Sequence, residues 1–410
     1  MRPVFAWCCR KGIPMYDDTA HIGRQIATLR KASRLTQRQL AGRVNVSLSL
    51  LQKVEVGDRA VSNGLLSGVA RELRVPIEKL TGQPYTEDRK DDSTHRQIDA
   101  IRAVLRGYDL PDEVPVRPVA ELAVEVKEVA RLRGEAQYGK MALRLPALLE
   151  ELTSAAYRES GTEVWNLLVS AYHATHTLLY RLGYSDLAEA VEHKLTWAAE
   201  RTGNPLAGAL AQWTRCVTFQ AAGDFTRGLR LMDTARSELD DQIRRDPADD
   251  AITVYGSLHL RSATLASRAG DGAATRSHLQ AAGDLATRIG QDQVHWGLTF
   301  GTANRATHEV AAHVELGDGI AAIKAAEHWR APRSMPRTRR AHHHIDVARA
   351  HLINDDRSAA LRSLQEARRI APQLTRLHPM VRELTAVLVS LHRRSNPELS
   401  KYAHWLGLAG

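Results

Sequence analysis

Apolar residues in the first fifth of the chain recur at intervals of three and four, and this pattern predicts short helices. Ile22 and Ile26 share one side of a predicted helix over residues 21–33. The same spacing predicts a helix over residues 63–73, with Asn63 as a candidate cap. Polar residues separate these segments, so each helix has one apolar side to bury.

Two further short helices are predicted between these segments. Thr36 is a candidate N-cap for a helix over residues 37–44, and Ser47 is one for a helix over residues 48–56. Asn45 lies where the chain must turn between them. Asparagine tolerates the left-handed backbone that a tight turn between helices needs.

These helices are too short to be stable alone, so they must pack together. Leu40 and Leu51 give the two central helices apolar faces, and Gly57 ends the second one. A last short helix is predicted to end near Leu80. The pattern therefore predicts a small five-helix domain over residues 21–84.

This predicted domain carries most of the positive charge of the protein. Residues 21–84 contain 11 Lys or Arg and four Asp or Glu, a formal charge of +7 out of +9 for all 410 residues. A compact unit with this excess is suited to binding a polyanion.

The segments LTQRQLA, SLSLLQK and Glu55-Val56-Gly57 resemble the phage-repressor (Cro/C1-like, XRE) family of helix-turn-helix DNA-binding domains. In that family the second helix of the pair enters the major groove. The resemblance implies that Leu48, Ser49, Gln52 and Lys53 face the bases and that Gln37 lies against the phosphates. The predicted DNA-binding residues are Gln37, Ser47, Leu48, Ser49, Gln52, Lys53, Arg59 and Asn63.

Two alternatives stay open within this resemblance. Gln52 and Lys53 could be ordinary solvated helix residues. Leu48 departs from the polar residue often found at its position, so it either contacts a thymine methyl group or leaves the reading to its neighbours. The resemblance also implies that Arg30 pairs with Glu55 and ties the first helix to the third.

Residues 85–118 are predicted to be a linker. The segment is polar and charged and contains Pro111, Pro115 and Pro118. Apolar residues at helical spacing predict a short helix over residues 95–107 within it. We interpret the segment as a hinge.

From residue 119 to residue 410 the pattern predicts helices only, with no convincing alternating strand. A turn phrase of Gly-Asp type recurs, and its members Gly183, Gly223, Gly270, Gly317 and Asn354 lie 40, 47, 47 and 37 residues apart. The glycine (or Asn354) fits the end of one helix, and the Asp or Ser after it fits the N-cap of the next. This period is typical of helix pairs in an α-solenoid.

The phrase G-D-x-x-x-A followed by Ala-rich helices resembles tetratricopeptide repeats. The predicted fold class is therefore all-α, a five-helix DNA-binding domain followed by a tetratricopeptide-like α-solenoid. This domain order resembles the RRNPP type of peptide-sensing regulators, in which the solenoid dimerises and binds a peptide. The resemblance implies a homodimer on a palindromic double-stranded DNA operator and a peptide or small-molecule effector.

Candidate ligand contacts in the solenoid are polar or aromatic residues in predicted helices. Asparagine can hold a peptide backbone, and arginine a carboxylate. The candidates are Asn166, His173, Trp213, Tyr255, His259, Asn304 and Arg305, and for each of them packing or solvation is the alternative. His342, His343 and His344 lack metal-ligand spacing, and the basic run over residues 333–340 is predicted to be a solvated loop.

Other classes of protein find little support. The sequence lacks a P-loop, a G-x-G-x-x-G motif after a strand, a nucleophile elbow and an H-E-x-x-H motif. No enzyme, catalytic residue, metal or cofactor is therefore predicted. No apolar run approaches the length of a membrane span. The vicinal Cys8 and Cys9 with Cys216 do not form a disulfide framework, and a cytoplasmic protein is predicted. Residues 1–20 are expected to be a disordered arm, unless translation begins at Met15.

The sequence leaves two functions open. The first is a transcription factor that responds to a ligand or peptide. The second is a scaffold whose solenoid binds a partner protein, with the DNA-binding domain only locating it. An Asn- and Arg-lined groove would favour the first, and a broad open face would favour the second.

Overall fold

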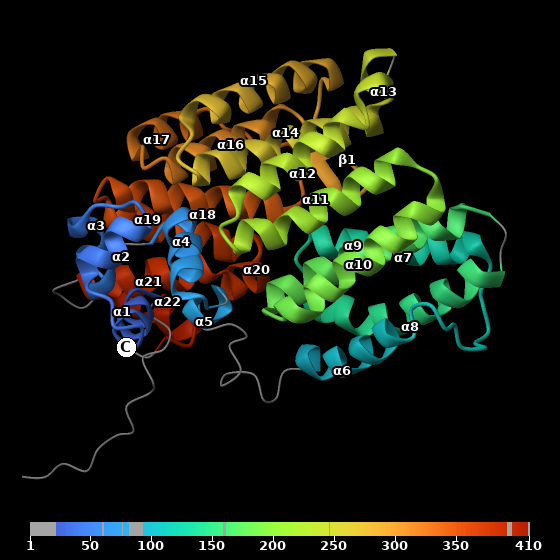
Figure 1. Cartoon of the computed structure of the whole chain (residues 1–410), viewed down its shortest axis with the longest axis horizontal. Coiled ribbons are helices and arrows are strands. Elements are labelled where there is room, and N and C mark those ends of the chain that lie inside the picture. Colours follow the sequence, from blue (N-terminus) through green and yellow to red (C-terminus); the bar gives the residue numbers. More distant parts are fainter. Residues whose placement is uncertain are drawn as a thin grey trace, which may run out of the picture.

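The computed structural model describes residues 22–59, 61–75, 77–81, 93–158, 161–245, 247–391 and 396–408. Within these ranges the chain folds into helices and one short β-hairpin (Figure 1). The predicted all-α class, with a helix-turn-helix unit followed by a solenoid of paired helices, is confirmed. No helix in these ranges is both long enough and apolar enough to cross a membrane. The predicted N-terminal arm lies outside the described residues.

The N-terminal unit, which we call the HTH unit, contains five helices. They are α1 (Ile22–Ala32), α2 (Gln37–Arg43), α3 (Leu48–Val56), α4 (Asn63–Leu73) and α5 (Ile77–Thr81). The predicted caps of the central pair are confirmed, since Thr36 accepts a hydrogen bond from Gln39 N and Ser47 accepts one from Leu50 N. Asn45 has a φ of 55° and Gly57 a φ of 86°, so both turn the chain in the left-handed region.

One predicted cap in this unit is wrong. The N-cap of α4 is Ser62, whose hydroxyl accepts a hydrogen bond from Leu65 N at 3.2 Å. Ser62 has the extended backbone that a cap requires, whereas Asn63 is already the first residue of the helix.

The core of the HTH unit joins all five helices. Leu40, Leu51 and Val54 are fully buried in it. At its edge Arg30 Nε donates to Glu55 Oε1 at 2.6 Å, and Arg30 Nη2 donates to Glu55 Oε2 at 2.9 Å. The ion pair implied by the family resemblance is therefore present and two-pronged, and it fixes α1 against α3.

The helix predicted within the linker is α6 (Ser93–Arg106). Ile98, Ile101 and Leu105 are buried in the large core of the solenoid, where α6 packs against α8 (Tyr138–Arg158). This part of the predicted linker is thus attached to the solenoid.

The solenoid continues with long helices that pack on their neighbours in sequence. They are α7 (Val119–Gly134), α9 (Glu163–Leu182), α10 (Ser185–Thr202), α11 (Pro205–Ala221), α12 (Phe225–Ser237), α13 (Asp240–Arg245), α14 (Asp249–Arg268) and α15 (Gly272–Ile289). After the hairpin follow α16 (Thr302–Glu315), α17 (Gly319–Glu327), α18 (Arg337–Ile353), α19 (Arg357–Ile370), α20 (Pro372–Leu377), α21 (Pro379–Leu391) and α22 (Pro397–Trp405).

The five predicted turns each join a pair of these helices. Gly183, Gly223, Gly270 and Gly317 all have φ values between 71° and 84°, which explains why glycine recurs there. In four of the five turns an aspartate caps the next helix: Asp224, Asp271, Asp318 and Asp356.

In the last turn Asn354 is the C-cap of α18, as predicted, and the left-handed residue is Asp355, with a φ of 59°. One detail of the turn prediction is wrong: in the first turn Ser185 is the first residue of α10. The cap position belongs to Tyr184, which makes no side-chain cap hydrogen bond.

A short antiparallel hairpin, β1 (Gln293–His295) and β2 (Leu298–Phe300), interrupts the helices, contrary to the prediction of helices only. Its two-residue turn has positive φ at Trp296 (52°) and Gly297 (70°), as in hairpin turns of the primed type. Phe300 is fully buried against α14 at Gly256, where any added Cβ would lie 2.1 Å from the ring. The hairpin is therefore held by packing against the helix.

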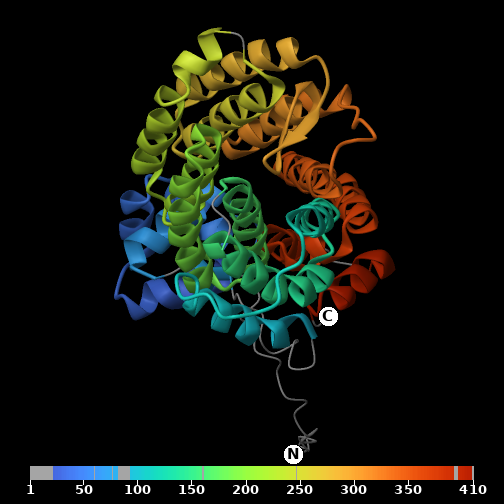
Figure 2. The ribbon, with the colours of Figure 1, turned by 90° about the vertical axis from the view of Figure 1, so that its right-hand side faces the viewer.

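The solenoid closes on itself. Figure 2 shows the helices following one another around a central space, and α7 and α9 from the start of the solenoid contact α18 and α20 near its end. Arg337 in α18 pairs with Glu135 at 2.9 Å, and Gly139 N donates to Gln373 Oε1 at 3.3 Å. The concave face is thus enclosed by the protein.

Candidate functional site

One face of α3 is buried and the other is open to solvent. Leu51, Val54 and Glu55 are buried, whereas Ser49, Gln52 and Lys53 are exposed. Because the buried face is anchored to α1 and α2, the exposed face is held rigidly on the outside of the molecule (Figure 1).

The surroundings of α3 are cationic. Of the 11 Lys and Arg in this unit, only Arg30 is buried, and the other ten are exposed. Its described acidic residues are few, and Glu55 is occupied by Arg30. A polyanion approaching α3 would therefore meet an excess of exposed positive charge.

The structure gives different surroundings to the eight predicted DNA-binding residues. Ser47, Ser49, Gln52, Lys53 and Arg59 are exposed, and Leu48 is half-buried. Gln37 donates a hydrogen bond to Glu55 Oε2 at 2.8 Å, so its side chain also supports the ion pair between α1 and α3. The side chain of Asn63 lies outside the described residues.

The HTH unit packs against the solenoid through faces other than that of α3. Ser67 Oγ in α4 donates to Gln220 O at 3.2 Å, and Arg71 donates to Gly223 O at 3.2 Å. Gly64 approaches α14 so closely that a Cβ there would lie 2.8 Å from Arg268 O. The buried Met380 of α21 belongs to the HTH core.

A buried carboxylic acid lies at this junction. Glu383 in α21 is fully buried and accepts a hydrogen bond from Ile22 N at 3.1 Å. Burial raises the pKa of Glu383 to about 7, although the Ile22 amide favours its charged form. The junction thus contains an acid that titrates near neutrality.

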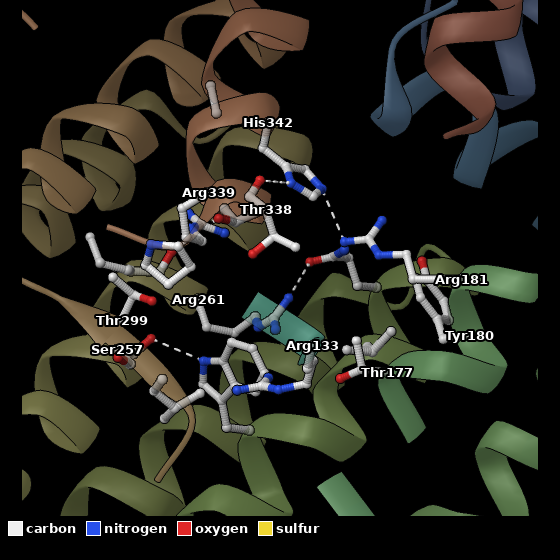
Figure 3. A pocket seen from close by; sticks show the side chains of 18 of the residues that line it. Arg133, Thr177, Tyr180, Arg181, Ser257, Arg261, Thr299, Thr338, Arg339 and His342 are labelled. Atoms are coloured by element: carbon white, nitrogen blue, oxygen red, sulfur yellow. Dashed lines mark hydrogen bonds between the residues drawn. The ribbon is translucent and has the colours of Figure 1, made fainter. Parts of the chain in front are cut away.

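A cavity of about 370 Å³ lies between the helices of the solenoid, and Figure 3 shows part of its lining. Its walls come from α7, α9, α11, α14, the hairpin, α16, α18 and α20, and from the HTH unit through Leu66, Ser67 and Ile77. A volume of this size is ordinary for a small-molecule site. The cavity is therefore bounded by both parts of the protein.

The cavity includes three of the seven predicted ligand contacts. His173, Trp213 and Asn304 line it. The other four lie elsewhere: the Asn166 amide donates to Thr162 O, Tyr255 donates to Asp240, His259 lies against His278, and Arg305 pairs with Glu309.

The sequence reading missed the arginines of the cavity. Five arginines line it from four different helices: Arg133, Arg181, Arg261, Arg268 and Arg339. Helical spacing could have indicated one of them: Arg261 lies three residues after Leu258 and four before Leu265, on the same face of the helix as these apolar residues.

The basic run over residues 333–340 is not a solvated loop throughout, which corrects that prediction. Its second half begins α18, and Arg339 turns inward to donate to Asn304 Oδ1 at 2.8 Å. The neighbouring histidines also separate: His342 faces the cavity, while the His343 ring stacks on Trp329 at 3.7 Å. Successive residues of a helix point in different directions, so the run has no single environment.

Comparison with known proteins identifies the N-terminal unit. Residues 21–80 match the family described as "Helix-turn-helix domain". A protein of Rhodospirillum rubrum named as an uncharacterized transcriptional regulator in the ATPase CF(0) region is 39% identical over 59 residues, which cover 14% of this chain and 55% of that relative. The match thus spans about half of the relative's length and a small part of this chain.

The chain also has a distant structural neighbour. The crystal structure of Bacillus thuringiensis PlcR in complex with the peptide PapR7 and DNA aligns with a TM-score of 0.33 and 14% identity, over 66% of this chain and 95% of that one. A similarity at this level carries no conclusion about the present protein. The family match and the geometry of α2 and α3 agree on one point: the N-terminal unit of this chain is a helix-turn-helix domain.

Proposed function

We propose that the protein is a sequence-specific DNA-binding transcriptional regulator. The observation that carries this proposal is the exposed face of α3, where Ser49, Gln52 and Lys53 project from a rigid helix-turn-helix surrounded by exposed cations. A helix of this kind fits the major groove of B-form DNA, and its polar side chains can bond to base edges. Arg59 follows the end of α3 and is positioned to contact a phosphate.

The regulator is proposed to act as a homodimer on a palindromic operator. A single HTH unit offers few base contacts, and two units joined through their solenoids would double them on half-sites about one helical turn apart. Dimerisation would also double the phosphate contacts and steepen the dependence of affinity on salt.

Control by a small ligand or short peptide is the second part of the proposal. The central cavity is bounded by the solenoid and by α4 and α5 of the HTH unit. A ligand there would contact the HTH unit only while that unit is packed on the solenoid, so it would bind this arrangement more tightly than one in which the unit is released. Such unequal binding is what regulation by a ligand requires. Its polar and Arg-lined walls favour a small ligand over the alternative of a scaffold for a folded partner protein, which would need a broad open face.

The test is fluorescence anisotropy with DNA from the gene's own upstream region, at fixed salt and with excess nonspecific competitor. We expect tight, competitor-resistant binding that Ser49→Ala and Lys53→Ala each weaken by about 10-fold. The exposed Lys324→Ala in α17 is the matched control, because it removes the same charge from a helix outside the HTH unit.

Equal affinities of Lys53→Ala, Lys324→Ala and the unaltered protein would overturn the proposed role of α3. Size-exclusion chromatography with light scattering tests the dimer separately. A monomer that binds its operator with full affinity would remove the dimer from the proposal.

A further inference from the structure

The central cavity gathers more positive charge than the carboxylates around it neutralise. Five arginines line it, and one of them, Arg268, lies 3.6 Å from the Glu315 carboxylate. The other four are Arg133 of α7, Arg181 of α9, Arg261 of α14 and Arg339 of α18, and Figure 3 shows these four side chains reaching in from different helices. Among the described residues the only acidic residue of the lining is Asp346. Asp346 is paired with Arg349 at 3.1 Å; it favours the charged form of Arg339, but the structure gives it no ion pair with any of the four.

Neutral groups are the partners that the structure gives to these four arginines. Arg181 lies 3.0 Å from His342 Nε2, and Arg133 lies 2.9 Å from His173 Nε2. Arg339 donates to Asn304 Oδ1 and lies 2.8 Å from His308 Nε2. These contacts orient the guanidinium groups but leave their charge in place.

Arg261 has the least polar surroundings of the four. It donates to Gln220 Oε1 at 3.2 Å, and its guanidinium carbon lies 3.9 Å from the centre of the Trp213 ring. Its Nε atom is buried and has no hydrogen-bond partner in the described structure. The Nδ1 atoms of His173 and His378, which also line the cavity, are likewise buried without a partner.

This arrangement is costly in the absence of a ligand. Burial lowers the pKa of Arg133 and of Arg339 to about 10, and it lowers the pKa of Arg261 as well. Arg133 and Arg339 remain charged at neutral pH, because a pKa of about 10 lies well above 7. Burying an uncompensated cation is unfavourable, and a bound anion would remove the penalty.

The histidines do not add to this charge. Burial lowers the pKa of His173, His308, His342 and His378 well below the ordinary value. Neutral imidazole can donate or accept, so these rings suit the oxygen atoms of a ligand as well as the guanidinium groups. The charge that a ligand would meet is therefore that of the arginines.

We propose that this cavity is a binding site for a small organic anion with at least two negative charges, carried by phosphate or carboxylate groups. Guanidinium groups bind both kinds of oxyanion with paired, charge-assisted hydrogen bonds. The cavity volume fits a small molecule. The inference deepens the proposed function, because such an anion would also touch Leu66 and Ile77 of the HTH unit, but the binding step itself requires no DNA.

The experiment is isothermal titration calorimetry on the full chain without DNA, at constant ionic strength. The probes are inorganic pyrophosphate and ADP for phosphate, and citrate and triglutamate for carboxylate. We expect saturable binding of at least one probe, and the responding pair identifies the source of the oxyanion. If none of the four binds above the response to sodium chloride of equal ionic strength, the proposal is overturned.

Arg261→Met and Arg339→Met locate the site. Each is expected to raise the Kd of the binding probe by about 10- to 100-fold, because each removes a charged hydrogen-bonding group. The melting temperature of the free variants should be unchanged or higher, since a buried, unpaired charge has been removed. The matched control is Arg230→Met, an exposed arginine of α12, which should bind as the unaltered protein does.

Binding that survives both cavity substitutions would place the anion elsewhere and overturn the assignment. If a methionine variant fails to fold, Arg339→Lys keeps the charge but loses the two-pronged geometry, and it should still raise the Kd.

Anisotropy on the operator is measured with and without the binding probe. A probe that binds the cavity but leaves DNA affinity unchanged would reject the proposed control of DNA binding while leaving the anion site intact.

Discussion

On the HTH unit ten of eleven basic side chains lie in solvent. In the solenoid, by contrast, five arginines line an enclosed cavity, and only Arg268 among them forms an ion pair in the described structure. In solvent a cation costs little and is free to meet a distant polyanion, and its effect is screened by salt. Inside the cavity a cation is expensive and weakly screened, so it favours a ligand that enters and neutralises it. The same residue type therefore suits the two regions to a large and a small anion.

The largest effect on stability is expected for Arg30, the one buried basic residue of the HTH unit. Arg30→Ala leaves the Glu55 carboxylate buried without its partner, which should destabilise the unit by about 3 kcal/mol. The measurement is urea unfolding followed by circular dichroism. Lys401→Ala, which removes the exposed pair with Glu398, should change the free energy of unfolding by less than about 0.5 kcal/mol.

Glu383 makes the junction between the HTH unit and the solenoid sensitive to pH. Its folded-state pKa of about 7 lies above the ordinary value of 4.5, so the folded protein retains a proton that the unfolded chain has lost. The stabilisation is complete below about pH 4.5 and is lost as pH rises through 7, by up to about 3 kcal/mol.

Unfolding measured between pH 5 and pH 8 checks this expectation against Glu383→Gln. The glutamine variant cannot lose a proton, so the free energy of unfolding of the unaltered protein should fall relative to it as pH rises. Parallel curves for the two proteins would show that Glu383 does not titrate in this range.

The close approach of α4 to α14 gives a smaller effect at the same junction. Gly64→Ala would place a Cβ 2.8 Å from Arg268 O, so the HTH unit must shift or separate, at a cost of about 2 kcal/mol. We expect faster proteolysis between the HTH unit and the solenoid. Gly42→Ala is the matched control, because a Cβ there meets nothing within 4 Å. Equal cleavage rates for both variants would argue against the observed packing.

The sequence predicts the local structure of both regions well. Thr36, Ser47 and Asn45 act through their own backbone neighbourhood, and the glycines of the repeat turns are needed for positive φ. Such local rules do not depend on distant contacts, so they can be applied to a sequence directly. Such rules are less exact between adjacent residues: the N-cap of α4 is Ser62 and not the predicted Asn63.

The features that arise from distant contacts were not predictable in this way. The cavity requires α7 and α9 to meet α18 and α20, and no periodicity in the sequence encodes that closure. The strands of the hairpin have three residues each, too few for an alternating pattern, and Trp296 is an unusual residue for its turn. The sequence therefore places Arg339 in a solvated loop and does not connect it with Arg261 of α14.

The smallest expected effect on stability, and the sharpest contrast with the cavity, belongs to Arg59. Its side chain is exposed beyond the end of α3, so Arg59→Ala should change the free energy of unfolding by less than about 0.5 kcal/mol. If it contacts a phosphate, the slope of log K against log salt should become shallower by about 0.9 for each protomer bound. Anisotropy at several salt concentrations measures that slope. An unchanged slope would remove Arg59 from the DNA interface, whereas a large loss of stability would mean that its side chain supports the folded structure.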